Sequence, residues 1–197
     1  MKHPIFVDMD DVIAETTRTY PKLVKEEFGI EATYEGISNF DLCDSFGLTK
    51  AQLAHLFEVV HRPEILLGFA PVKGARETLT WFQEKGHPIA IITGRPPKAK
   101  ELSLEWLSSN QIPFDTFEIC DKYGRHPKNS SISLDELKSR PFALAVEDSI
   151  SMATFLSETM AVPTCLFDRP WNQRAPHSKA KRFTSWKSIR AFGEAIL

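Results

Sequence analysis

Three aspartates follow the first short apolar run of the chain within four positions. The run Pro4–Val7 leads directly into Asp8, Asp10 and Asp11. Two unit charges about 4 Å apart repel by roughly 4 kcal/mol at an effective dielectric of about 20. Carboxylates grouped at the end of a buried strand therefore need either full solvation or a bound cation. Oxygen ligands of this kind suit Mg²⁺, which takes a few carboxylates together with a substrate phosphate.

Helix capping and calcium binding are the alternative roles for such acids. Carboxylates after a strand can cap the following helix, as Asp148 and Ser149 would for the helical segment that follows them. An EF-hand calcium loop that starts at Asp8 requires glycine at its sixth position and glutamate at its twelfth. The chain has Ile13 and Thr19 there. The calcium loop is excluded, and a magnesium site explains the crowding better than capping does.

Residues suited to phosphate chemistry also end later apolar runs. Five β-rich runs are bounded by turn residues: Pro4–Asp8, Pro88–Thr93, Phe114–Asp121, Phe142–Asp148 and Pro163–Asp168. Thr93 ends the second run, Lys122 follows the third, and Glu147 and Asp148 end the fourth. Because ligands of an open parallel sheet bind outside the carboxyl ends of its strands, these side chains are expected at one rim.

Helical patterns separate these runs and must position them. They cover Gly74–Lys85, Pro97–Asn110, Ser149–Met160 and Ser185–Leu197. Strands that alternate with helices predict βαβ units. The fold class is therefore α/β, with a Rossmann-like, mainly parallel sheet flanked by helices.

Residues 15–70 interrupt this alternation. Segments 15–29 and 49–62 look helical, and the stretch between them is irregular and rich in turn formers. No strong strand signal follows either helical segment. We predict a small helical cap at 15–70, inserted after the first strand and standing over the sheet edge where Asp8 lies. The catalytic core then comprises residues 1–14 and 71–197.

The composition limits which binding partners and which cellular location are expected. The 197 residues are 42% hydrophobic and 25% charged, and the formal net charge of −2 gives no reason to expect a nucleic-acid polymer or a membrane as partner. The three cysteines form no CxxC pair, no apolar stretch reaches about 18 residues, and acids follow the N-terminus too soon for a signal peptide. A cytoplasmic protein is expected. Residues 169–190 carry seven Lys or Arg and no acid, which indicates a solvated surface segment or, alternatively, local attraction of an anionic substrate.

Three motifs at these strand ends carry a resemblance to a known family. The chain reads Asp8-Met9-Asp10-Asp11-Val12 after one strand, Thr93-Gly94-Arg95 after a second and Glu147-Asp148-Ser149 after a third. In this order and placement they resemble the haloacid dehalogenase superfamily of phosphohydrolases, over the chain from Ile5 to about Asp168. The resemblance implies Mg²⁺-dependent hydrolysis of a phosphate monoester through an aspartyl-phosphate.

The resemblance also implies a role for each matching residue. Asp8 would be the nucleophile, Asp10 the general acid and base, and Thr93 a ligand of the transferring phosphoryl group. Asp148 would hold Mg²⁺ with the Asp8 side chain and the Asp10 carbonyl, and Glu147 would bind the metal directly or through water. An acid at position 10 favours phosphate chemistry, because the dehalogenases of the superfamily have none there.

The superfamily further needs a lysine between the threonine and the final acids. Lys122, at a predicted strand end, is the first candidate, followed by Lys128 and then Lys138, which lies in a helical stretch. Gly94 and Arg95 are the expected substrate-binding residues. Arg95 and Arg169 are candidates for a contact with phosphate, and surface ion pairing is the alternative for both.

Asp11 departs from the family pattern, which commonly has glycine after the second aspartate. Glycine eases a tight turn with unusual backbone angles, and aspartate tolerates such turns better than most residues. We expect Asp11 to be compatible with activity.

A narrower resemblance concerns the substrate. DMDDVIAET, VEDS, LFDRPWN and the short cap resemble the 5′-nucleotidase and deoxyribonucleotidase branch. A small phosphorylated substrate is expected, with a nucleoside monophosphate favoured over a sugar phosphate turned over by a phosphatase or phosphomutase. Candidates for stacking on a base, for which core packing is the alternative, are Phe40, Phe46, Phe69 and Trp171. Non-enzymatic alternatives are a receiver-like regulatory domain and a catalytically silent module. The sequence indicates no oligomeric state.

Overall fold

A six-stranded parallel sheet forms the centre of the computed structural model, which describes residues 2–127, 129–173 and 179–197. The strand order is β3-β2-β1-β4-β5-β6, and every neighbouring pair is parallel. The strands are β1 (Ile5–Val7), β2 (Ile89–Thr93), β3 (Thr116–Ile119), β4 (Leu144–Glu147), β5 (Thr164–Phe167) and β6 (Lys181–Phe183). Each of the five apolar runs holds one strand, which confirms the predicted α/β class.

The sixth strand was not predicted. Strand β6 lies within the basic segment 169–190 and pairs with β5 through Lys181, Arg182 and Phe183. Two of these three residues are exposed, because an edge strand needs an apolar face only toward the core. Lys181 and Arg182 are thus at the surface, as expected, whereas Arg169, Trp171 and Asn172 of the same segment are buried, so the expectation of a wholly solvated stretch is wrong for them.

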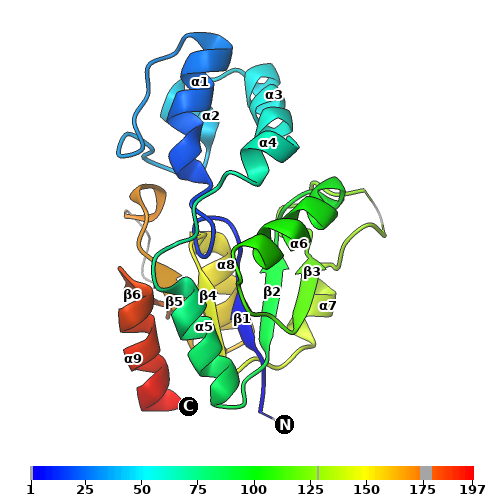
Figure 1. Ribbon diagram of the computed structural model, residues 1–197, viewed down its shortest axis with the longest axis vertical. Coiled ribbons are helices and arrows are strands. Elements are labelled where there is room, and N and C mark those ends of the chain that lie inside the picture. Colours follow the sequence, from blue (N-terminus) through cyan, green and yellow to red (C-terminus); the bar gives the residue numbers. More distant parts are fainter. Residues whose placement is uncertain (1, 128, 174–178) are drawn as a thin grey trace.

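Helices cover both faces of the sheet (Figure 1). On one face lie α5 (Ala75–Glu84), α6 (Lys100–Ser109) and α9 (Trp186–Ile196); on the opposite face lie α7 (Leu134–Lys138) and α8 (Ile150–Thr154), which continues into a π-helical turn, Phe155–Thr159. Side chains of β1 alternate between the two faces. Ile5 and Val7 belong to the apolar cluster that contains the first helix group, and Phe6 belongs to the cluster of α7 and α8.

Local signals fix where these helices begin. Gly74 precedes α5 with a φ of 85°, a left-handed conformation that favours glycine. Ser133 and Glu136 form a capping box at the start of α7, and the Ser185 side chain accepts the Ser188 N–H at the start of α9. The starts of α7 and α9 are therefore set by residues adjacent in the sequence.

The segment after β1 folds into four helices: α1 (Tyr20–Phe28), α2 (Leu42–Phe46), α3 (Lys50–Val60) and α4 (Pro63–Leu66). Figure 1 shows them together at one end of the molecule, away from the two termini. The two chain segments that connect these helices to the core run side by side. The Glu15 N–H donates to the Ala70 carbonyl and the Val72 N–H donates to the Ile13 carbonyl, both at 2.8 Å. This pairing supports the proposed division into a cap at 15–70 and a core.

The parts of the chain that the structure describes contain no helix long and apolar enough to cross a membrane.

Candidate active site

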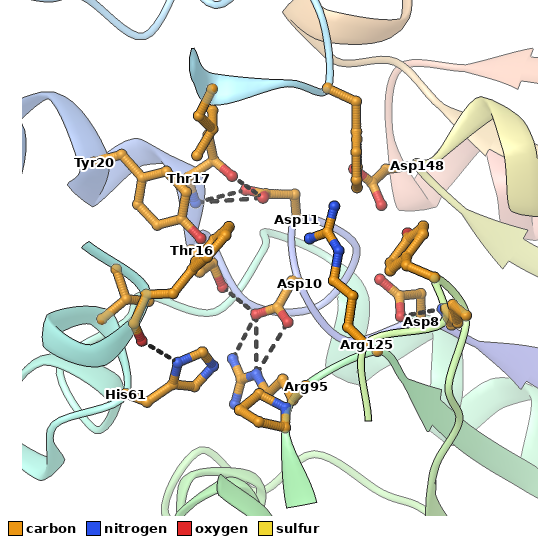
Figure 2. A pocket seen from close by; sticks show the side chains of 18 of the residues that line it. Asp8, Asp10, Asp11, Thr16, Thr17, Tyr20, His61, Arg95, Arg125 and Asp148 are labelled. Carbon is orange, nitrogen blue, oxygen red and sulfur yellow. Dashed lines mark hydrogen bonds and ion pairs between the residues drawn. The ribbon is translucent and has the colours of Figure 1, made fainter. Parts of the chain in front are cut away.

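A cavity of about 360 Å³ lies between the carboxyl ends of the strands and the cap (Figure 2). The core contributes residues that follow five different strands, β1 to β5, and the cap contributes residues from α1, α3 and the loop between α1 and α2. Core residues around the cavity include Asp8, Asp10, Asp11, Gly94, Arg95, Lys122 and Asp148. The structure thus brings these predicted residues together at the carboxyl ends of the strands, as the rule that ligands bind at these ends (the strand-end rule) predicts.

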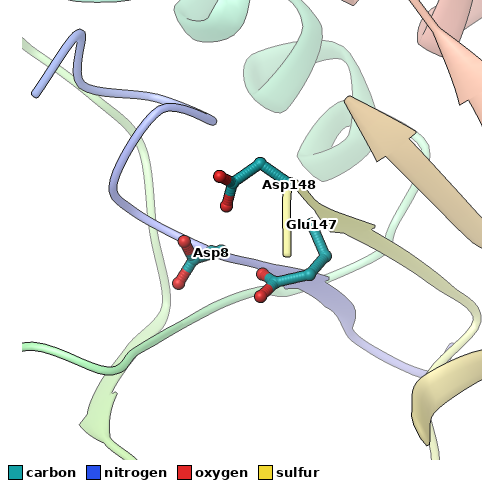
Figure 3. A group of neighbouring side chains, drawn as sticks. All are labelled: Asp8, Glu147 and Asp148. Atoms are coloured by element: carbon teal, nitrogen blue, oxygen red, sulfur yellow. The ribbon is translucent and has the colours of Figure 1, made fainter. Parts of the chain in front are cut away.

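Asp8, Glu147 and Asp148 form a buried cluster of carboxylates (Figure 3), of which Asp8 and Asp148 line the cavity. Each offers one oxygen within 4.8 Å of the other two. Burial raises the pKa of Asp8 and raises that of Glu147 well above its ordinary value; burial, together with the charge of Asp8, raises the pKa of Asp148 to about 7. These carboxylates repel each other, and a divalent cation between them would relieve that repulsion.

Lys122 contacts two members of this cluster with its ammonium group. Its Nζ lies 2.6 Å from Asp8 Oδ1 and 3.3 Å from both carboxylate oxygens of Glu147. Burial alone would lower the pKa of Lys122, but the Asp8 and Glu147 carboxylates raise it well above its usual value. Lys138 lies exposed on α7, and Lys128 lies outside the described residues. The contacts favour Lys122 over Lys138.

Two side chains, Thr16 and Arg95, hold the Asp10 carboxylate (Figure 2). Arg95 donates to it from Nε, at 3.0 and 3.1 Å, and from Nη2, at 2.6 Å, and the Thr16 hydroxyl donates at 2.5 Å. Burial favours the neutral acid, but Arg95 outweighs it and lowers the pKa of Asp10. Arg95 Nη1 donates to Ser103. The guanidinium predicted to bind substrate is therefore engaged with Asp10 and Ser103.

Thr93 and Gly94 shape the end of β2 beside the cluster. Thr93 is fully buried, and its hydroxyl oxygen accepts the Arg95 N–H at 3.2 Å. A Cβ on Gly94 would lie 3.2 Å from the Tyr123 ring and 3.4 Å from Lys122 Cδ. Glycine at position 94 therefore allows the loop that carries Lys122 to pack closely against β2.

Asp11 adopts a left-handed conformation with a φ of 57°. Its carboxylate accepts the Thr17 N–H at 3.1 Å and the Thr17 hydroxyl proton, so it fixes the 3₁₀ turn Thr17–Thr19 that leads into α1. Burial and the charge of Asp148 raise the pKa of Asp11 well above its ordinary value. The residue that replaces the family's glycine thus keeps the glycine-like turn and connects it to the cap.

We expect Asp11→Gly to be more stable than Asp11→Ala by about 1 kcal/mol, because only alanine is strained at positive φ. Both variants lose the same hydrogen bonds to Thr17, so their difference reports the backbone alone. Urea unfolding of the two variants measures it. Equal stabilities would show that the turn relaxes when the side chain is removed.

Several residues of the site were missed or given another role from sequence. Trp171 was a candidate for base stacking, yet its indole N–H donates to Asp148 Oδ2 at 2.8 Å. Arg169 was considered as a phosphate contact, yet its Nε donates to the Asp11 carbonyl at 2.7 Å. Both follow β5, so the strand-end rule applied to Asp168 would have pointed to them. His61 of the cap had no sequence signal; it lines the cavity, its Nδ1–H donates to the Phe57 carbonyl, and burial lowers its pKa.

The remaining aromatic candidates lie in different surroundings. Phe40 and Phe69 line the cavity, whereas Phe46 is buried in the apolar core and does not line it. The Phe40 ring is 49% exposed and lies 5.5 Å from the Tyr123 ring, so it bridges cap and core at the cavity.

Acids at the end of a central parallel strand, beneath a helical insertion, form the arrangement expected of the phosphohydrolases of the haloacid dehalogenase superfamily. The profile of one family within it, described as "5′ nucleotidase, deoxy (Pyrimidine), cytosolic type C protein", matches residues 2–131. The chain belongs to this family.

Individual relatives agree with this assignment. "Putative nucleotidase BH1399" of Halalkalibacterium halodurans is 27% identical over 187 residues, which is 94% of this chain and 90% of the relative. The haloacid dehalogenase-like hydrolase SP0104 of Streptococcus pneumoniae shares the fold with a TM-score of 0.65 at 11% identity, covering 97% of this chain and 98% of that one. The "putative HAD-hydrolase YfnB" of Bacillus subtilis, whose structure holds magnesium, gives 0.59 at 14%, with coverage of 96% and 97%.

Proposed function

We propose that the protein is a Mg²⁺-dependent phosphatase of small phosphate monoesters that acts through an aspartyl-phosphate, with a (deoxy)nucleoside monophosphate as the favoured substrate. One observation carries the proposal. The Asp8 carboxylate lines the cavity, lies 2.6 Å from the Lys122 ammonium and has an oxygen within 4.8 Å of those of Glu147 and Asp148. A phosphoryl group at Asp8 would therefore meet the Lys122 ammonium and any cation that the acid pair holds.

The donor set fits Mg²⁺, which prefers carboxylate oxygens. Asp8, Asp148 and the Asp10 carbonyl would hold the ion, with Glu147 as a direct or water-mediated ligand. When bound, it would neutralise part of the charge on the phosphoryl oxygens. The geometry of the acid cluster supports a cation there, because three buried carboxylates each offer an oxygen within 4.8 Å of the others. The magnesium in the structure of YfnB is consistent with this choice.

In the proposed first step an oxygen of Asp8 attacks phosphorus and the ester P–O bond breaks. Lys122 would offset the negative charge on Asp8 and on the phosphoryl oxygens, and Thr93 would donate its hydroxyl to one of those oxygens. In the second step water attacks the same phosphorus, which releases inorganic phosphate and restores the Asp8 carboxylate.

Asp10 would transfer the protons of both steps. Its ion pair with Arg95 favours the carboxylate, which is the form that takes a proton from the attacking water. Protonation of the leaving oxygen needs the opposite form. Arg95 would therefore help to set the protonation of Asp10, because its ion pair favours the carboxylate over the acid.

The cap side of the cavity supports a substrate with a flat or apolar part. Phe40, Phe57 and Phe69 line it, together with the polar side chains of Asn39 and His61. A volume of about 360 Å³ lies in the range typical of small-molecule sites. The family description and the nucleotidase relative favour a nucleoside monophosphate. A sugar phosphate, acted on by a phosphatase or phosphomutase, is the alternative.

A phosphate-release screen over nucleoside monophosphates and sugar phosphates tests the proposal. We expect release with Mg²⁺, loss of activity with EDTA, and recovery when Mg²⁺ is restored. Steady release of free phosphate without an isomerised product would exclude a phosphomutase. Activity that is indifferent to both EDTA and Mg²⁺ would contradict the metal assignment, and preference for sugar phosphates would contradict the nucleotide assignment.

The proposed partners follow from the position of the site beneath the cap. A cavity covered by a cap suits a small phosphorylated substrate better than a nucleic-acid polymer. The cytoplasmic location remains a proposal, favoured by the cytosolic type of the matching family.

A further inference from the structure

We infer that Trp171 is a positioning residue: its indole N–H orients the Asp148 carboxylate toward the cation that the acid cluster would bind. The inference rests on the proposed function, since Asp148 is a proposed metal ligand. The motif that contains Trp171, LFDRPWN, lies outside the three motifs that carry the superfamily resemblance.

The contact has the geometry of a strong buried hydrogen bond. Trp171 Nε1 lies 2.8 Å from Asp148 Oδ2, and the two residues are 6% and 5% exposed. An indole N–H only donates, so Trp171 cannot itself bind a cation. By occupying Oδ2 it leaves Oδ1 available as a ligand and limits rotation of the carboxylate. Ligating carboxylates are commonly hydrogen-bonded in this way, and loss of such partners weakens metal binding.

The turn that carries the indole is fixed to the same acid loop. Asn172 Nδ2 donates to the Asp148 carbonyl and to the Phe167 carbonyl, both at 2.8 Å. Arg182 of β6 donates to the Asn172 carbonyl at 2.7 Å. The 3₁₀ turn Pro170–Asn172 is therefore tied to the main chain of Asp148 as well as to its side chain, and the indole has a defined position relative to the carboxylate.

The cap also contacts the indole ring. Tyr34 packs edge-on against Trp171, with ring centroids 5.9 Å apart and an interplanar angle of 86°. The Arg18 guanidinium lies 4.2 Å from the centroid of the Tyr34 ring. Phenylalanine at position 171 would keep an aromatic ring for this packing but would lose the donor and part of the volume of the indole, a change of volume that the same substitution at Trp106 also makes.

The test is Mn²⁺ binding to the full chain, measured from the electron paramagnetic resonance signal of free Mn²⁺. We expect Trp171→Phe to raise the Kd roughly 10- to 100-fold. Trp106→Phe is the matched control: it also removes a buried indole N–H, which donates to the Phe69 carbonyl at 2.9 Å, but it lies away from the acid cluster. Its Kd is expected to equal that of the wild type. Trp171→Tyr restores a donor and is expected to bind Mn²⁺ more tightly than Trp171→Phe.

The outcomes separate this inference from the proposed function. If the wild-type protein binds no Mn²⁺, or Asp148→Asn binds it as well as the wild type, the proposed metal site fails and the inference fails with it. If the wild type binds Mn²⁺ and both Trp171 variants bind it as tightly as the wild type does, only the inference is overturned. An equal loss in Trp106→Phe would also overturn it, because the effect would then be a general one. Thermal unfolding without metal verifies that each variant is folded.

Discussion

Asp8→Asn is expected to lower turnover by at least roughly 10⁴-fold, the scale seen when an enzyme loses its nucleophile. The amide has nearly the size of the carboxylate but supplies no anionic oxygen to attack phosphorus. Asn Oδ1 can still accept the hydrogen bond from Lys122, whose Nζ lies 2.6 Å from Asp8 Oδ1. The variant is therefore expected to fold. Phosphate release under single-turnover conditions measures the loss.

Asp135→Asn is the matched control for this variant. Asp135 is an exposed aspartate in the first turn of α7, and it does not line the cavity. The same chemical change there is expected to leave turnover unchanged. Circular dichroism verifies that both proteins are folded. Retained turnover in folded Asp8→Asn would refute the nucleophile assignment.

The second large effect is expected for Lys122→Met, on both activity and stability. Lys122 is buried between Asp8 and Glu147, so its removal leaves two carboxylates without their cation. Breaking a buried ion pair by removing one partner typically costs about 3–5 kcal/mol. We expect a loss of that size in the free energy of unfolding without metal, measured by urea denaturation, and no detectable phosphate release.

A double variant separates charge balance from chemistry. Lys122→Met combined with Glu147→Gln removes one buried acid together with the base, so it is expected to recover part of the lost stability. It should recover no activity, because the phosphoryl group would still lack its cationic partner. Lys138→Met, at an exposed lysine of α7, is the control and is expected to change stability by less than about 0.5 kcal/mol. If Lys122→Met were as active as the wild type, another lysine would have to offset the charge on the phosphoryl group.

The core of the site was predictable because its residues obey one local rule. Asp8, Thr93 and Asp148 each stand directly at or after the end of a short apolar run. Once those runs form a parallel sheet, topology brings their carboxyl ends together. The alternation of runs and helices was also visible in the sequence, and so was the interruption by residues 15–70.

Contacts between distant segments were beyond that rule. Arg95 reaches Asp10 across 85 positions, and Trp171 reaches Asp148 across 23, by side-chain directions that no local pattern encodes. Strand β6 was missed for a different reason. Its three residues are mostly exposed at the sheet edge, so they carry no apolar run to mark them.

Ala14 and Pro71 lie opposite each other in an antiparallel bridge, and the insertion at 15–70 begins and ends there. Because the two ends of the inserted segment already lie side by side, the segment can lengthen, shorten or be replaced without any change in the order of the strands. We therefore expect substrate selection to diverge through substitutions within 15–70, with Thr16 and Thr17 retained because their side chains hold Asp10 and Asp11.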